Sequence, residues 1–140
     1  MIGTDIAIDL GTSNFKVYLD GKGIVLSEPS IIAVDTLTDE VIAIGTEAYK
    51  MLGRTSDRIV VSRPLCNGVI SDFSLAEHLI TYYLKRLGSS RVFMPRVVVS
   101  VPCGVTEVEK RAVVDAIGAA GVRKVCLIED PVAAAIGAGV

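Results

Sequence analysis

The sequence predicts an α/β domain built on a mixed sheet, and three observations lead to that prediction. Two nearly continuous apolar runs, Val97–Val101 and Val125–Ile128, have the character of strands buried on both faces. Amphipathic helical patterns precede, separate and follow these runs, as in parallel crossover units. The N-terminal part instead alternates short apolar runs with tight polar turns, which is typical of antiparallel hairpins.

Apolar runs predict the following N-terminal strands: Ile6–Leu10, Phe15–Leu19, Gly23–Leu26, Ser30–Val34 and Val41–Ile44. The first two flank a turn at Gly11–Asn14, and Pro29 separates the third from the fourth. Thr46 is expected to cap a short helix that runs through Leu52 and ends at Gly53. The sequence from there to Ser62 has no regular pattern.

Helix signals dominate the C-terminal half. Ser74–Glu77 reads as a capping box, and apolar residues then recur at helical spacing as far as Leu87. Thr106–Glu109 is a second capping box, opening a helix that ends at Gly121. Pro131 is expected in the first turn of a third helix, where its missing N–H costs nothing.

Composition limits the classes of function. The 140 residues suffice for one domain with a real core, and a hydrophobic fraction of 51% argues against disorder. A formal net charge of −2 offers no basic patch, so no nucleic-acid partner is expected. No apolar run approaches the roughly 18 residues of a membrane span. The three cysteines lack metal-ligand spacing and are expected to be buried, reduced thiols of a cytosolic protein.

The turn after the first predicted strand could carry chemistry. Gly11 lets the backbone approach a ligand, and Thr12, Ser13 and Asn14 supply hydroxyl and amide donors. Successive backbone N–H groups in such a turn form a concavity suited to phosphate. Asp9 would repel a bare phosphate, but it fits a Mg²⁺ ion held through water. An ordinary polar hairpin with a solvated aspartate is the alternative.

Asp9–Asn14 is similar to the first phosphate motif of the superfamily that contains actin, sugar kinases and heat-shock chaperones. Further stretches narrow the resemblance to bacterial actins of the MreB/Mbl type, over essentially the whole chain: Gly21–Ser30, Met51–Thr55, Arg63–Pro64 with Gly68–Phe73, Val101–Pro102 with Gly104–Ala112, and Leu127–Pro131 with Ala133–Gly137.

The resemblance implies the N-terminal half of a filament-forming, cell-shape-determining cytoskeletal ATPase. The implied fold is a ribonuclease-H-like sheet with flanking helices, over about 1–29 and 71–140, with a small inserted subdomain over about 30–70. ATP or ADP would contact Gly11, Thr12, Ser13 and Asn14, with Mg²⁺ held by Asp9 through water. Filaments of this family lie in the cytoplasm against the inner membrane and guide cell-wall synthesis. A stand-alone, non-hydrolysing module that binds filaments, or half of a sugar-kinase or chaperone-type ATPase, are the alternatives.

Two departures bear on catalysis. The family usually has Glu-Glu-Pro where this chain has Glu129-Asp130-Pro131, so the carboxylate expected to orient the attacking water is one methylene shorter. A misplacement of about 1 Å can cost on the order of 100-fold in rate. Asp130 could also simply cap the following helix. In addition, the second phosphate motif and the adenosine-binding glycines are not present, so weak ATP affinity is expected of this half alone.

Val92, Phe93 and Met94 form an apolar segment between Arg91 and Arg96. It could fold back on the core, or form an interfacial wedge on the inner membrane with the arginines at anionic head groups. Relatives use a hydrophobic loop nearby in that way.

Overall fold

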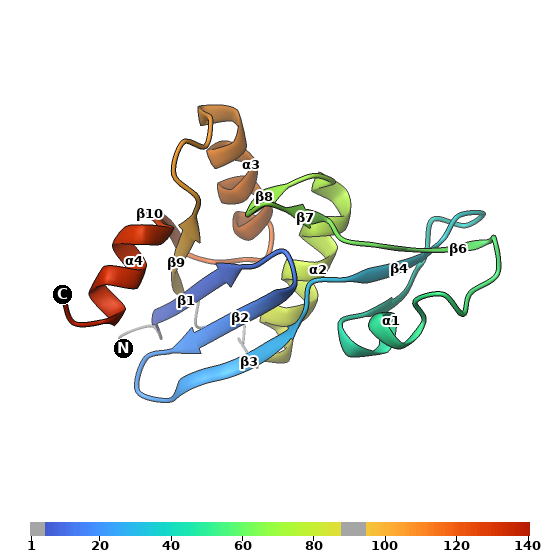
Figure 1. Ribbon diagram of the computed structural model, residues 1–140, viewed down its shortest axis with the longest axis horizontal. Helices are drawn as coiled ribbons and strands as arrows, with labels where there is room; N and C mark the ends of the chain where they lie inside the picture. Colours follow the sequence, from blue (N-terminus) through green and yellow to red (C-terminus); the bar gives the residue numbers. More distant parts are fainter. Residues whose placement is uncertain (1–4, 88–94) are drawn as a thin grey trace.

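The computed structural model describes residues 5–87 and 95–140. Their largest unit is a five-stranded sheet in the order β10-β9-β1-β2-β3 (Figure 1). Its strands are β1 Asp5–Leu10, β2 Asn14–Leu19, β3 Gly23–Pro29, β9 Arg96–Val101 and β10 Lys124–Glu129. β1, β2 and β3 pair antiparallel, whereas β9 lies parallel to both β1 and β10. The carboxyl ends of β1, β9 and β10 therefore meet at one edge of the sheet.

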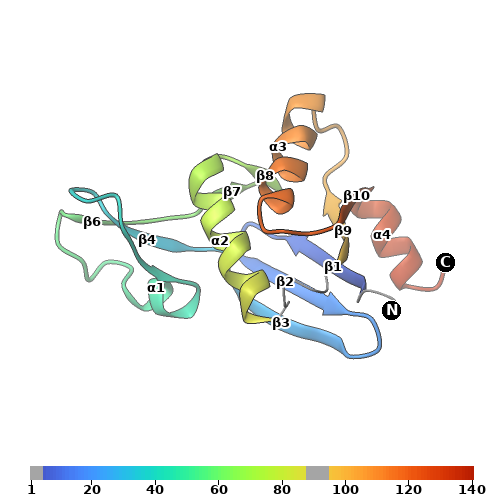
Figure 2. The same ribbon diagram turned by 180° about the vertical axis from the view of Figure 1, so that it is seen from behind.

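One face of this sheet carries the main core. The helices that contribute to this core are α2, Phe73–Arg86, and α3, Glu107–Gly118. In Figure 1 the sheet hides part of α2, and in Figure 2, seen from behind, α2 crosses in front of the strands. Ile6, Ile8 and Leu10 alternate toward this core, so Ala7 and Asp9 of the same strand face the opposite side. Helix α4, Asp130–Gly137, follows β10 directly.

A second, smaller unit extends away from the main sheet, at the right of Figure 1. It contains a three-stranded sheet in the order β5-β4-β6, built from Val41–Ile44, Ile32–Asp35 and Ile59–Ser62, with helix α1, Thr46–Lys50. A separate cluster of Ile31, Ala33 and Ala48 forms its core. The short pair β7, Leu65–Cys66, and β8, Val69–Ile70, leads back to α2. The bounds expected for the inserted subdomain, about 30 and 70, stay a prediction.

The N-terminal caps of two helices differ from those predicted from the sequence. The cap of α2 is Asp72, whose side chain accepts from the Leu75 N–H, so the box predicted at Ser74 is wrong. α1 has Gly45 at its N-cap and no side-chain cap, so capping by Thr46 is also wrong. Thr106 does cap α3, because its hydroxyl accepts from the Glu109 N–H. Both errors shift the helix start by one or two residues, because the backbone conformation that makes a residue the N-cap depends on where the chain turns.

Other differences concern regularity and burial. β6 lies in a stretch without a sequence pattern and forms because β4 provides a pairing partner. The three cysteines are exposed free thiols, so the expectation that they are buried is wrong. Cys126 illustrates the reason, because it lies on the edge strand β10 and alternation directs it away from the core.

Candidate functional site

A groove of about 920 Å³ opens on the sheet face opposite α2. Its polar lining includes Asp9, Lys16, Ser100 and Asp130, contributed by β1, β2, β9 and α4. Its apolar lining includes Ala7, Tyr18, Ile24, Val98, Ile128 and Ile136. A concave apolar surface with a few convergent polar groups is the usual form of a small-molecule site.

Strand register brings these polar groups together. Asp9 is paired with Lys16 across the antiparallel β1–β2 ladder and with Ser100 across the parallel β1–β9 ladder. Burial against the groove raises the pKa of Asp9, Lys16 lowers it by a smaller amount, and the negative charge of Asp130 raises it further. A partly buried carboxylate whose pKa is raised by a second carboxylate nearby is a common feature of ligand sites.

The predicted phosphate loop, Gly11–Asn14, follows Asp9 at the end of β1. A Cβ on Gly11 would lie under 3.0 Å from the Asn14 carbonyl oxygen, so the turn requires glycine there. The loop presents its carbonyl side to the protein: the Gly11 oxygen accepts from the Ser30 hydroxyl at 2.7 Å, and the Ser13 oxygen accepts from the Ser30 N–H at 2.9 Å. Within the described residues, the N–H groups of Gly11, Thr12 and Ser13 have no protein acceptor. Free amides in a turn are the donors that a phosphate needs.

The two predicted catalytic carboxylates have different surroundings. Asp130 lines the groove with Asp9, whereas Glu129 accepts a hydrogen bond from the Cys103 thiol, with Sγ and Oε2 3.2 Å apart. That bond, with burial and the nearby negative charges, raises the pKa of Cys103. The N-cap of α4 is Glu129, without a side-chain bond, and Asp130 occupies the first helical position, so capping by Asp130 is wrong. Of these two carboxylates, only Asp130 therefore lines the groove.

The donor set suits a magnesium ion accompanied by phosphate. Mg²⁺ is usually held by one or two carboxylates, with water and substrate phosphates completing its shell. Asp9 and Asp130 supply two carboxylates, and their mutual repulsion would be relieved by a cation between them. Residues 5–87 and 95–140 contain no group of three or more His, Cys, Asp or Glu that could hold a metal on its own.

Sequence reasoning missed Lys16, Ser100 and the loop-holding Ser30. Lys16 could have been found by pairing the predicted hairpin around the Gly11–Asn14 turn, which sets it opposite Asp9. Ser30 could not, because its 19-residue separation from Gly11 is closed only by the fold.

The predicted membrane segment, Val92, Phe93 and Met94, lies outside the described residues. Arg96, expected beside it at lipid head groups, pairs with Asp5 through two bonds of 2.8 Å. No helix in the described parts of the chain has the length and apolar character to cross a membrane.

A protein-family model described as MreB/Mbl protein matches residues 3–140. The chain belongs to the MreB/Mbl family. It is 44% identical over 140 residues to the cell shape-determining protein Mbl of Bacillus cereus and 45% identical over 145 residues to the cell shape-determining protein MreB of Escherichia coli K12. Each alignment includes 99% of this chain but 42% of the relative, so the chain spans about two fifths of the length of these proteins.

Solved structures agree with this membership of the MreB/Mbl family. MreB5 of Spiroplasma citri bound to AMPPNP matches with a TM-score of 0.90 at 35% identity, covering all of this chain and 42% of that one. The same protein bound to ADP matches with a TM-score of 0.88 over 99% of this chain and 41% of that one. A MamK double helical filament, at 20% identity and a TM-score of 0.81 over 97% of this chain and 43% of that one, shows the actin-like fold alone. The predicted fold class and family resemblance are thus confirmed.

Proposed function

We propose that this chain forms one wall of the ATP site of a filament-forming, cell-shape-determining ATPase of the MreB type. One observation carries the proposal: the free amides of Gly11–Ser13 begin two residues after Asp9, which shares a groove with Asp130. The nucleotides named for the related MreB5 structures agree with this chemistry.

Each group then has a defined task. The amides of Gly11, Thr12 and Ser13, with the Asn14 side chain, bind phosphate oxygens. Asp9 would hold Mg²⁺ through water, and Asp130 would orient the water that attacks the terminal phosphate. The magnesium ion would neutralise phosphate charge during transfer. Because the Asp130 carboxylate is one methylene shorter than glutamate, hydrolysis is expected to be slower than in relatives with glutamate there.

Nucleotide titration of the isotope-labelled chain tests the site. Adding Mg²⁺ and ATP should shift the backbone amide resonances of Gly11–Asn14, and Asp9→Asn should remove the dependence on Mg²⁺. Asp20→Asn is the matched control, since Asp20 is an exposed aspartate at the other end of the same hairpin. Binding should be weak, because one wall offers few contacts. Unshifted loop resonances at saturating nucleotide would refute the site, and sub-micromolar affinity by calorimetry would refute the single wall.

We further propose that this protein assembles into filaments in the cytoplasm, peripheral to the inner membrane, and works with cell-wall synthesis proteins. The names of the curated relatives support the role in cell shape. The apolar run Val92–Met94 next to Arg91 supports membrane contact. Flotation with anionic liposomes should be reduced by combining Phe93→Asp with Met94→Asp, and unchanged flotation would exclude the wedge.

A further inference from the structure

Two segments far from the phosphate loop in sequence hold its carbonyl side. Ser30, which is fully buried, donates its hydroxyl to the Gly11 oxygen and its N–H to the Ser13 oxygen. Arg63 donates from Nη1 to the Thr12 oxygen at 3.4 Å and to the Ser13 oxygen at 3.5 Å. Ser30 lies where the chain enters the three-stranded sheet, and Arg63 lies where it leaves β6. Both chain connections between the two sheets therefore donate hydrogen bonds to the same loop.

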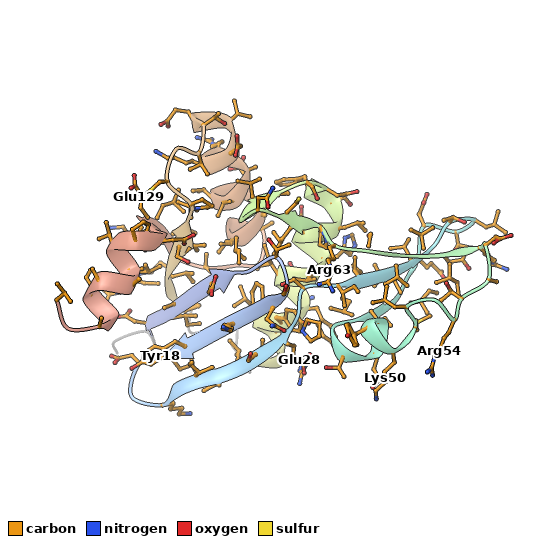
Figure 3. All side chains as sticks on the ribbon, in the orientation of Figure 1. Tyr18, Glu28, Lys50, Arg54, Arg63 and Glu129 are labelled. Atoms are coloured by element: carbon orange, nitrogen blue, oxygen red, sulfur yellow. The ribbon has the colours of Figure 1, made fainter. Side chains whose placement is uncertain are left out.

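The contacts of Arg63 differ from those of most other arginines in the structure. Arg58, Arg86, Arg96 and Arg111 each pair with a carboxylate. Among the described residues, no carboxylate lies within salt-bridge distance of Arg63, and its partners are two backbone oxygens of the loop. Figure 3 shows Arg63 at the junction between the two sheets, whereas Arg54 points outward from the smaller one.

The charge of Arg63 has a directional effect on the loop. Peptide dipoles align with their oxygens toward a cation, so a guanidinium on the carbonyl side favours the conformation whose N–H groups point the other way. Each contact is long and weak alone, but a single cation acts on two adjacent peptides. The peptide with the Thr12 oxygen carries the Ser13 N–H, which belongs to the set proposed to bind phosphate, and the peptide with the Ser13 oxygen carries the adjoining N–H of Asn14.

We propose that Arg63 is a positioning residue that preorganises the phosphate loop and couples its order to the strand returning from the smaller sheet. The phosphate role of the loop rests on the proposed function; the ordering by Arg63 does not. Movement of β6 would loosen the loop and weaken phosphate binding, and bound phosphate would in turn restrain β6, because coupling between two sites is reciprocal.

Loop order can be measured without any nucleotide. The Ser30 N–H, bonded to the Ser13 oxygen, is a hydrogen-exchange probe of loop opening. Arg63→Ala should speed its exchange about fivefold, the change that one net hydrogen bond commonly makes, and should lower the ¹⁵N heteronuclear NOE of Thr12 and Ser13. Arg54→Ala is the control, because Arg54 is exposed in the same unit and no side-chain bond of it is found in the described structure. Arg63→Lys should lie between the two, since it keeps the charge and loses the planar fork.

The possible results are distinct. Faster exchange at Ser30 with unchanged exchange in β9, and about fivefold weaker binding of Mg²⁺-tripolyphosphate, is the expected outcome. Equal Ser30 exchange in the Arg63→Ala and Arg54→Ala variants overturns the proposal. A uniform acceleration of all core amides also overturns it, since that would be a general loss of stability. If the unmodified chain does not bind tripolyphosphate, the proposed function fails while the exchange data still decide the role of Arg63.

Discussion

Gly45 is the position at which one methyl group should disturb both the fold and the phosphate loop. Its backbone has φ +72° and ψ −132°, a conformation that side chains with a Cβ rarely adopt. An added Cβ would lie under 3.0 Å from both the Tyr83 hydroxyl oxygen and Glu28 Oε2. That hydroxyl donates to the Pro29 oxygen at 2.8 Å, and Pro29 directly precedes the loop-holding Ser30.

The expected cost of Gly45→Ala has two parts. Holding alanine in this region of backbone space costs about 1–3 kcal/mol. Displacing the Tyr83 hydroxyl loses a hydrogen bond worth about 1 kcal/mol, whereas Glu28 can move because it is a flexible side chain. The free energy of unfolding should therefore fall by about 2–4 kcal/mol. For a chain of this length, the midpoint of thermal unfolding should drop by about 6–16 °C.

The chain contains no tryptophan to serve as a fluorescence probe, so thermal unfolding should be followed by far-UV circular dichroism. Gly53→Ala is the matched control: its φ is +69°, but an added Cβ meets nothing within 4 Å, so it should cost only about 1 kcal/mol. In a double-mutant cycle, Tyr83→Phe should relieve about 1 kcal/mol of the cost at Gly45. Equal losses for the two glycine variants, or strict additivity with Tyr83→Phe, would refute the steric reasoning.

Three further predictions test the site and the helix cap. Glu129→Gln should lower the pKa of Cys103, because it removes the negative charge that favours the neutral thiol. In a chain whose other cysteines are replaced by serine, alkylation of Cys103 at a fixed alkaline pH should then become severalfold faster. An unchanged alkylation rate would contradict the contact between Glu129 and Cys103. The pKa of Asp9 is raised in the folded state, so its contribution to stability is lost as pH rises from the unfolded value of 3.8 through the folded one. Asp9→Asn should therefore raise the melting temperature at pH 7 more than at pH 3, and a lower value at pH 7 would be the contrary result. Asp72→Ala should cost about 1 kcal/mol in urea unfolding and Ser74→Ala less than about 0.5 kcal/mol; the reverse order would restore the cap predicted from sequence.

The spacing of apolar residues and the positions of turn residues were enough to predict the order of the helices and strands. Alternation in Ile6–Leu10 and the helical stripe after Ser74 follow from the repeat of each backbone, so they can be recognised before any contact is known. The loop Gly11–Asn14 could be proposed as a phosphate site for the same reason, because its donors are adjacent in the chain. The predicted N-caps of α2 and α1 were wrong. The actual caps, Asp72 and Gly45, are decided by a hydrogen bond and a backbone angle that depend on the direction from which the chain enters the helix.

The sequence by itself determined the α/β class and the resemblance to the MreB/Mbl family, and it singled out Gly11–Asn14 as a candidate phosphate loop, because all of these depend on neighbouring residues. Only the tertiary structure decided that Asp130 shares a groove with Asp9 while Glu129 pairs with Cys103. It also decided that Arg63, 51 positions after Thr12, donates a hydrogen bond to the loop. Such contacts form when sheet pairing brings distant segments together, and their geometry is set by register and packing rather than by local preference.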